Sequence, residues 1–208
     1  MRARAFQQID VFSQRPGDGN PLAVVLDAGD LSDADMQRFA TWANLSETTF
    51  LLPPSEAGRA AGADYRVRIF SPRGELPFAG HPTLGTCHAW LQAGHSPRTP
   101  GCILQECGLG QVRIHQQGAL LAFAAPALAR STPNPALLAL VTGALGLRTS
   151  QIVATQLLDN GPRWLALLLD SADTVLGLRP DHARLKDLGQ DVGVVHVAPT
   201  ASDTGTPG

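Results

Sequence analysis

The sequence lacks the features that would place this protein in or on a membrane. No apolar stretch in its 208 residues approaches the length of a membrane-spanning helix. The first residues run into a strand-like segment instead of the apolar centre of a signal peptide. We therefore expect a cytoplasmic protein with no membrane partner.

An excess of charge of one sign is also missing. The 16 Lys and Arg residues against 18 Asp and Glu residues give a formal net charge of −2. Such a surface has no general attraction for phosphate backbones, so we expect no nucleic-acid partner. Apolar residues make up 44% of a chain that is long enough to bury a sizeable core, which is typical of a globular protein.

Cysteine is scarce, with only Cys87, Cys102 and Cys107. An odd number in a sequence with no other sign of secretion argues against a disulfide framework. Cys102 and Cys107 flank a strand-like run, and their odd separation sends them to opposite faces, which makes a poor metal site. We expect three small core residues and no metal.

The most informative stretch is Phe70–Leu91, which resembles the end of a strand, a Gly/Pro loop and the start of an almost wholly apolar helix. Pro82 suits the first helical position, and Gly80 leaves room for a ligand close to the backbone. The first-turn amides of Thr83–Gly85 would lack intrahelical partners, so this helix start is predicted to bind a carboxylate or phosphate. The alternative is a capped core helix that binds nothing.

The remaining periodicity predicts an α+β fold, because short strands are interrupted by single helices without regular alternation. Helices are expected at Asp33–Ala43, after the Ser32 cap, at Pro135–Leu145, after Asn134, and at Asp181–Leu188. Strands are expected at Ala5–Phe12, Pro21–Leu26, Thr48–Leu52, Asp64–Phe70, Cys102–Cys107, Gln111–His115, Ala119–Ala124, Ile152–Leu158, Trp164–Leu169 and Val192–Val197.

An internal repeat indicates two related halves. Asp18–Asp30 is echoed by Asp159–Asp173, and each copy reads as a Gly/Asn/Pro turn, a buried strand and an Asp-containing approach to a helix. We expect halves at residues 1–118 and 119–208, with a ligand cleft at their interface. The second copy has no counterpart of the glycine loop or the apolar helix, so we expect the second half to lack its own central helix and the chain to be a fragment or a naturally short form.

Three polar residues could carry chemistry. Glu47 stands among hydroxyl and apolar neighbours, and partial desolvation would raise its pKa enough to take and return a proton near neutrality. The alternative is a solvated residue at a strand edge. His81 could be an acid, a substrate donor or a ring packed in a loop, and Asn20 a ligand donor or a turn residue. Arg73 and Glu75 are expected on a solvated loop.

These motifs resemble one family. GNPLAVV (19–25), SETTF (46–50) and RIFSPRGELPFAGHPTLGT (68–86) are similar to the PhzF-like isomerases of phenazine biosynthesis, which share the diaminopimelate-epimerase fold. The resemblance implies two pseudo-symmetric halves, each a curved sheet around a central helix, with the active site between them. It also implies a homodimer, no cofactor and a small carboxylic acid as substrate. Glu47 is then the expected catalytic acid/base, and the expected substrate-binding residues are Asn20, Ser46, Gly80, His81 and Thr83.

The sequence departs from the family in one respect. The acidic, glycine-rich segment of the type EDPATGSA that ordinarily opens the second central helix is absent. A rival hypothesis is therefore a catalytically impaired, truncated member that acts as a binding or scaffold protein. A cysteine-dependent epimerase is a third possibility. The epimerase relatives use a pair of cysteines, whereas this sequence has Glu47 and His81 at the matching positions, which favours proton transfer by a carboxylate.

Overall fold

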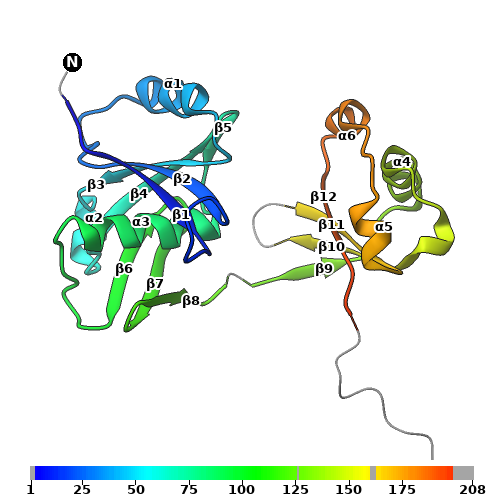
Figure 1. Cartoon of the computed structure of the whole chain (residues 1–208). Helices are drawn as coiled ribbons and strands as arrows, with labels where there is room; N and C mark the ends of the chain where they lie inside the picture. The colour runs from blue at the N-terminus through cyan, green and yellow to red at the C-terminus, as the bar shows by residue number, and fades with distance from the viewer. Residues whose placement is uncertain (1–2, 126, 160–162, 199–208) are drawn as a thin grey trace, which may run out of the picture. The chain divides into compact units, whose positions relative to one another are not determined.

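The computed structural model describes residues 3–125, 127–159 and 163–198, and the chain divides into two compact units, residues 1–125 and 126–208 (Figure 1). Each unit contains a sheet with helices, so the predicted α+β class is confirmed. Among the described residues, no helix is both long and apolar enough to cross a membrane.

The first unit is built on an eight-stranded sheet in the order β1-β2-β3-β4-β6-β7-β8, with β5 paired to β4. β1–β2 is antiparallel, β2–β3 parallel and β3–β4 antiparallel. The strands are β1 (Phe6–Val11), β2 (Asn20–Val25), β3 (Thr48–Leu52), β4 (Tyr65–Ser71), β5 (Gly74–Leu76), β6 (Cys102–Cys107), β7 (Gly110–Gln117) and β8 (Leu120–Phe123).

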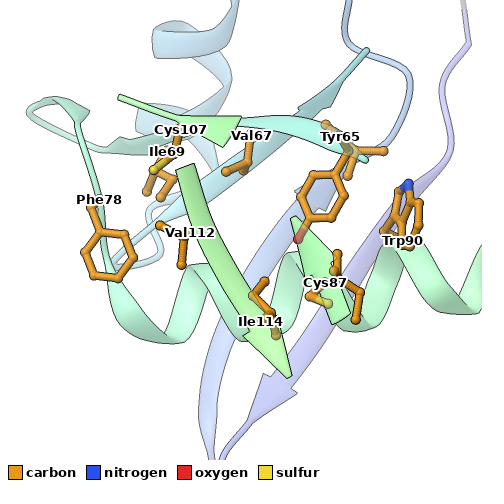
Figure 2. Packing of buried hydrophobic residues seen from close by; sticks show 11 residues of the cluster. Tyr65, Val67, Ile69, Phe78, Cys87, Trp90, Cys107, Val112 and Ile114 are labelled. Atoms are coloured by element: carbon orange, nitrogen blue, oxygen red, sulfur yellow. The ribbon is translucent and has the colours of Figure 1, made fainter. Parts of the chain in front are cut away.

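Helices cover both faces of this sheet. α1 (Asp33–Ala43) places Met36 and Ala40 against Phe50 and Phe70 on one face. α3 (Gly80–Gln92) lies on the other face, where its Cys87 and Trp90 join Tyr65, Val67, Ile69, Ile103 and Ile114 in the largest core cluster (Figure 2). The sequence predicts a helix enclosed on all sides, but α3 is buried along one broad face only, and His88 and Gln92 are exposed. A short helix, α2 (Glu56–Ala60), joins β3 to β4.

A close approach between α3 and the sheet requires glycine at position 85. A Cβ atom on Gly85 would lie 2.6 Å from Leu22 Cδ2 and 2.8 Å from Val11 Cγ2. We expect Gly85→Ala to destabilise the protein by about 1 kcal/mol, because overpacking costs about 1–3 kcal/mol and the better helix propensity of alanine returns only about 1 kcal/mol. Chemical unfolding measures this. The matched control is Gly143→Ala in α4 (Pro135–Leu145), where an added Cβ meets nothing within 4 Å and helix propensity should raise stability. An alanine at 85 that left stability unchanged would contradict the packing argument.

The second unit has a four-stranded sheet in the order β12-β11-β10-β9. Leu165, Leu167 and Leu169 of β11 face Val141 and Leu145 of α4 in a separate core. The opposite face of β11 carries Trp164, which is 42% exposed. The elements of this unit are β9 (Ala129–Ser131), α4, β10 (Ile152–Asp159), β11 (Arg163–Leu169), α5 (Ala172–Leu176), α6 (His182–Leu188) and β12 (Asp191–Val195), with a 3₁₀ turn at Thr149–Gln151.

The two sheets repeat one strand pattern. In the first unit, β1–β2 is antiparallel and β2–β3 parallel, with α1 between the parallel strands. In the second unit, β10–β11 is antiparallel and β11–β12 parallel, with α5 and α6 between them. The sequence echo indicated the shared order of a strand followed by a helix, and the matching strand directions are a finding of the structure. The predicted turn at 160–162 and the segment 199–208 lie outside the described residues.

Several local predictions need correction. The sequence predicts that the first half ends at residue 118. In the structure the first unit extends to residue 125, because β8 pairs with β7 and belongs to the same sheet. Glu75 is exposed as predicted but lies in the short strand β5 instead of a loop, and its carboxylate accepts two hydrogen bonds from Arg68, at 2.7 and 2.6 Å. Cys102 is partly exposed, because it lies on the less buried face of β6, whereas Cys87 and Cys107 are buried as predicted.

Candidate active site

Four of the predicted site residues meet at one edge of the first sheet. β2 and β3 are parallel, with Ala23 opposite Thr48, so Asn20 at the start of β2 lies near the residues that precede β3. Ser46 and Glu47 are those residues. The first turn of α3 brings His81 to the same edge, and the cluster is thus assembled from three separate segments within one unit.

Glu47 and His81 face each other across this edge. Glu47 Oε2 lies 3.4 Å from His81 Nε2, and the two side chains are only 18% and 9% exposed. Among the described residues neither atom has a hydrogen-bond partner, because their alignment at this distance is not that of a hydrogen bond. Two facing polar atoms that are buried without partners are expensive to maintain, and such a pair is suited to a ligand that supplies the missing hydrogen bonds.

Burial moves the pKa values of this pair toward the neutral forms. Desolvation raises the pKa of Glu47 above its usual value, and a hydrogen bond from Ser46 partly opposes that shift. Desolvation lowers the pKa of His81. A carboxyl group with a raised pKa is a stronger base when ionised and can also return a proton, which is what an acid/base role requires.

Asn20 fixes the form of the His81 ring. Its Nδ2 atom lies 3.4 Å from His81 Nδ1, and an amide nitrogen can only donate, so Nδ1 accepts and the proton of the neutral ring resides on Nε2. In this orientation of the amide, Asn20 Oδ1 lies 3.5 Å from Ser46 Oγ, within reach of a hydrogen bond. His81 therefore carries its proton on Nε2, the ring nitrogen that lies 3.4 Å from Glu47 Oε2.

A neighbouring carboxylate shapes the turn before Asn20. Asp10 Oδ2 accepts from the backbone amides of Gly17 and Gly19, at 2.7 and 3.2 Å. Gly19 has no room for a side chain, since a Cβ there would lie 2.4 Å from Val11 O. Asp10 was not among the residues predicted from the sequence, although an acidic residue seven positions before a glycine turn is a weak signal for such a contact.

The start of α3 differs from the prediction in its register. The helix begins at Gly80 and Pro82 is its third residue, a place where a missing N–H is equally harmless because no first-turn amide has an intrahelical partner. The unpaired first-turn amides are thus those of Gly80 and His81. The Thr83 amide donates to Ala79 O at 3.2 Å, and the Thr83 side chain is 0% exposed, behind the site rather than at its surface.

The cysteines lie away from this cluster. Burial raises the pKa of the Cys87 thiol to about 12, so it is protonated at neutral pH and a poor nucleophile.

A cavity of about 360 Å³ occurs at the opposite end of α3, beside Trp90 and His95, and contains none of the predicted site residues.

Residues 9–206 match the family described as phenazine biosynthesis-like proteins. Among curated relatives, antisense-enhancing sequence 1 of Schizosaccharomyces pombe is 39% identical over 90% of this chain and 65% of its own length. Trans-2,3-dihydro-3-hydroxyanthranilate isomerase of Pseudomonas aeruginosa is 38% identical over 86% of this chain and 62% of its own length. The chain thus spans less than two thirds of either relative.

Solved structures agree with the fold. A predicted epimerase from Pseudomonas aeruginosa superposes with a TM-score of 0.73 at 27% identity, over 93% of this chain and 70% of the other. A PhzF-family phenazine biosynthesis protein from Bacillus anthracis gives a TM-score of 0.75 at 22% identity, over 93% of this chain and 67% of the other, which is evidence for the fold alone. By sequence match, fold and the motifs that surround Glu47 and His81, this chain belongs to the phenazine biosynthesis-like family.

Proposed function

We propose that this protein is an isomerase that moves a proton between two carbon atoms of a small carboxylic acid, with Glu47 as acid/base and no cofactor. The observation that carries the proposal is the facing pair of buried, unpartnered atoms, Glu47 Oε2 and His81 Nε2. Membership of a family with named isomerases supports the reaction type.

The chemistry needs only one carboxyl group in two protonation states. Ionised Glu47 takes a proton from a C–H bond, and the electron pair delocalises through the adjacent unsaturated system. The same carboxyl then returns the proton to another carbon, so one C–H bond breaks, one forms, and nothing is oxidised or reduced. The raised pKa of Glu47 brings its two forms closer in free energy near neutral pH, which favours both half-steps.

The substrate carboxylate is proposed to bind at the start of α3. The amides of Gly80 and His81 have no intrahelical partners, and the helix dipole adds positive potential there. Ala79 offers no side-chain cap that would compete for these donors. The relative from Pseudomonas aeruginosa is named for an anthranilate, which carries a carboxylate, and this supports the same class of substrate here.

The test is an isomerisation assay in D₂O with the full chain and trans-2,3-dihydro-3-hydroxyanthranilate, followed by proton NMR. We expect a rearranged product, with deuterium at the newly formed C–H bond in the fraction of turnovers in which the proton on Glu47 exchanges with solvent before it is returned. Binding of the compound without isomerisation or deuterium uptake would overturn the proposal and favour the non-catalytic binding protein. The homodimer and the cytoplasmic location stay predictions of the sequence.

A further inference from the structure

A chain of buried hydrogen bonds runs from the sheet to the first turn of α3. Tyr65 OH donates to Gln105 Oε1 at 3.0 Å, and Gln105 Nε2 donates to Thr83 Oγ1 at 3.1 Å. Thr83 Oγ1 in turn donates to the backbone oxygen of Ala79 at 3.0 Å. Tyr65 is 2% exposed, and Gln105 and Thr83 are 0% exposed, so these three hydrogen-bonded side chains are shielded from water.

Gln105 occupies a position that packing alone would assign to an apolar residue. It lies in β6 between Ile103 and Cys107, which point to the same buried side of the strand. Its strand neighbour is Tyr65, whose ring packs beside Trp90 and Cys87 over α3 (Figure 2). A buried primary amide is tolerable only when its polar atoms are paired, and Gln105 pairs both its oxygen and its nitrogen.

This series of hydrogen bonds ends at the peptide group between Ala79 and Gly80, at the start of α3. Ala79 O accepts from both the amide and the hydroxyl of Thr83, at 3.2 and 3.0 Å. The carbonyl and the following N–H of a trans peptide point in opposite directions. Because the Ala79 carbonyl is held toward the helix interior, the Gly80 N–H is held outward, at the end of α3 where the first-turn donors have no intrahelical partner.

We propose that Gln105, braced by Tyr65, is a positioning residue that fixes the Gly80 amide, and with it the neighbouring His81, through Thr83 and Ala79. This inference rests on the proposed function, in which that amide binds the substrate carboxylate. Thr83 then acts behind the site, as a relay within the protein, rather than by touching substrate.

The test compares three variants of the full chain. Gln105→Leu keeps the approximate volume and removes both bonds, and Tyr65→Phe removes only the hydroxyl, which keeps the test valid if the leucine variant does not fold. Ile103→Val is the matched control on the same buried side of β6, because it loosens packing without touching the chain of bonds. We measure KM and kcat for the isomerisation and hydrogen exchange of the Thr83 amide in the unliganded protein.

We expect Gln105→Leu to raise KM about tenfold and to speed exchange of the Thr83 amide at least tenfold, with kcat changed less. Tyr65→Phe should shift both quantities in the same direction by a smaller factor, and Ile103→Val should shift neither. Unchanged KM and unchanged exchange in folded Gln105→Leu or Tyr65→Phe would overturn the proposal. If the wild-type chain does not isomerise, the proposed function fails by itself, and the exchange data still decide whether Gln105 holds this turn.

Discussion

Replacing Glu47 by glutamine should lower the isomerisation rate about 10³-fold, within the range that a positioned acid/base contributes, while substrate still binds. Glutamine keeps the size and the polar oxygen of the side chain but neither takes a proton from carbon nor returns one. The measurement combines steady-state kinetics with deuterium uptake, and binding is followed separately by titration with anthranilate. Turnover equal to that of the wild type would remove Glu47 from the mechanism.

The matched control for this variant is Glu56→Gln. Glu56 is an exposed residue in the first turn of α2, in the same unit but outside the Glu47 cluster. The same chemical change there should leave kcat and KM within twofold of the wild type. A comparable loss at both positions would mean that the substitutions act through stability rather than through the reaction.

Glu47→Gln should also change how the stability of the protein depends on pH, in a direction that the raised pKa of Glu47 fixes. Burial raises the pKa of Glu47 above its unfolded value, so the folded state favours the protonated form. The contribution of this group to stability is therefore fully present below the unfolded pKa and is lost as pH rises through the folded pKa. Glu47→Gln should consequently be more stable than the wild type at pH 8 and nearly equal to it at pH 4, as measured by chemical unfolding at both pH values. If Glu47→Gln were less stable than the wild type at pH 8, the ionised Glu47 carboxylate would not be destabilised by desolvation, which would contradict this prediction.

The close placement of Asn20, Glu47 and His81 could be predicted because each residue lies at the beginning of a strand or helix. Asn20 begins β2 and Glu47 precedes β3, and parallel neighbouring strands start at the same edge of a sheet. The glycine loop and the apolar helix bring His81 to that edge. Local patterns thus indicated the elements, and the motif resemblance indicated that the elements meet.

What the sequence did not reveal depends on contacts between distant side chains. Gln105 lies in an alternating strand pattern, and only the structure shows that it faces inward and reaches Thr83. The exact start of α3 also escaped prediction, because proline is tolerated throughout the first turn and does not mark one position in it. β5 and α2 have three and five residues, too few to display a period in the sequence.

Replacing Asn20 by aspartate should change the charge of His81 and lower kcat/KM about 10²-fold, the low end of what a positioned acid or base contributes. Asn20 donates to His81 Nδ1 in the wild type, at 3.4 Å, and keeps the ring proton on Nε2. A carboxylate in the same place only accepts, so it draws a proton onto Nδ1 and stabilises the imidazolium form. The pKa of His81, lowered by burial in the wild type, should rise by about one unit or more.

The ring nitrogens report this change directly in ¹⁵N NMR spectra recorded across pH. In the wild type we expect a neutral ring with the proton on Nε2 at pH 7, and in Asn20→Asp a ring that is protonated on both nitrogens. The control is Asn134→Asp, which replaces the N-cap of α4 by an equally good cap and should leave the titration of His81 unchanged. A positive charge on His81 would also stabilise ionised Glu47, 3.4 Å away, and make it a weaker base. The loss of rate and the rise in the pKa of His81 should therefore occur together, and an unchanged His81 titration with a full loss of rate would show that Asn20 acts on the substrate and not on the ring.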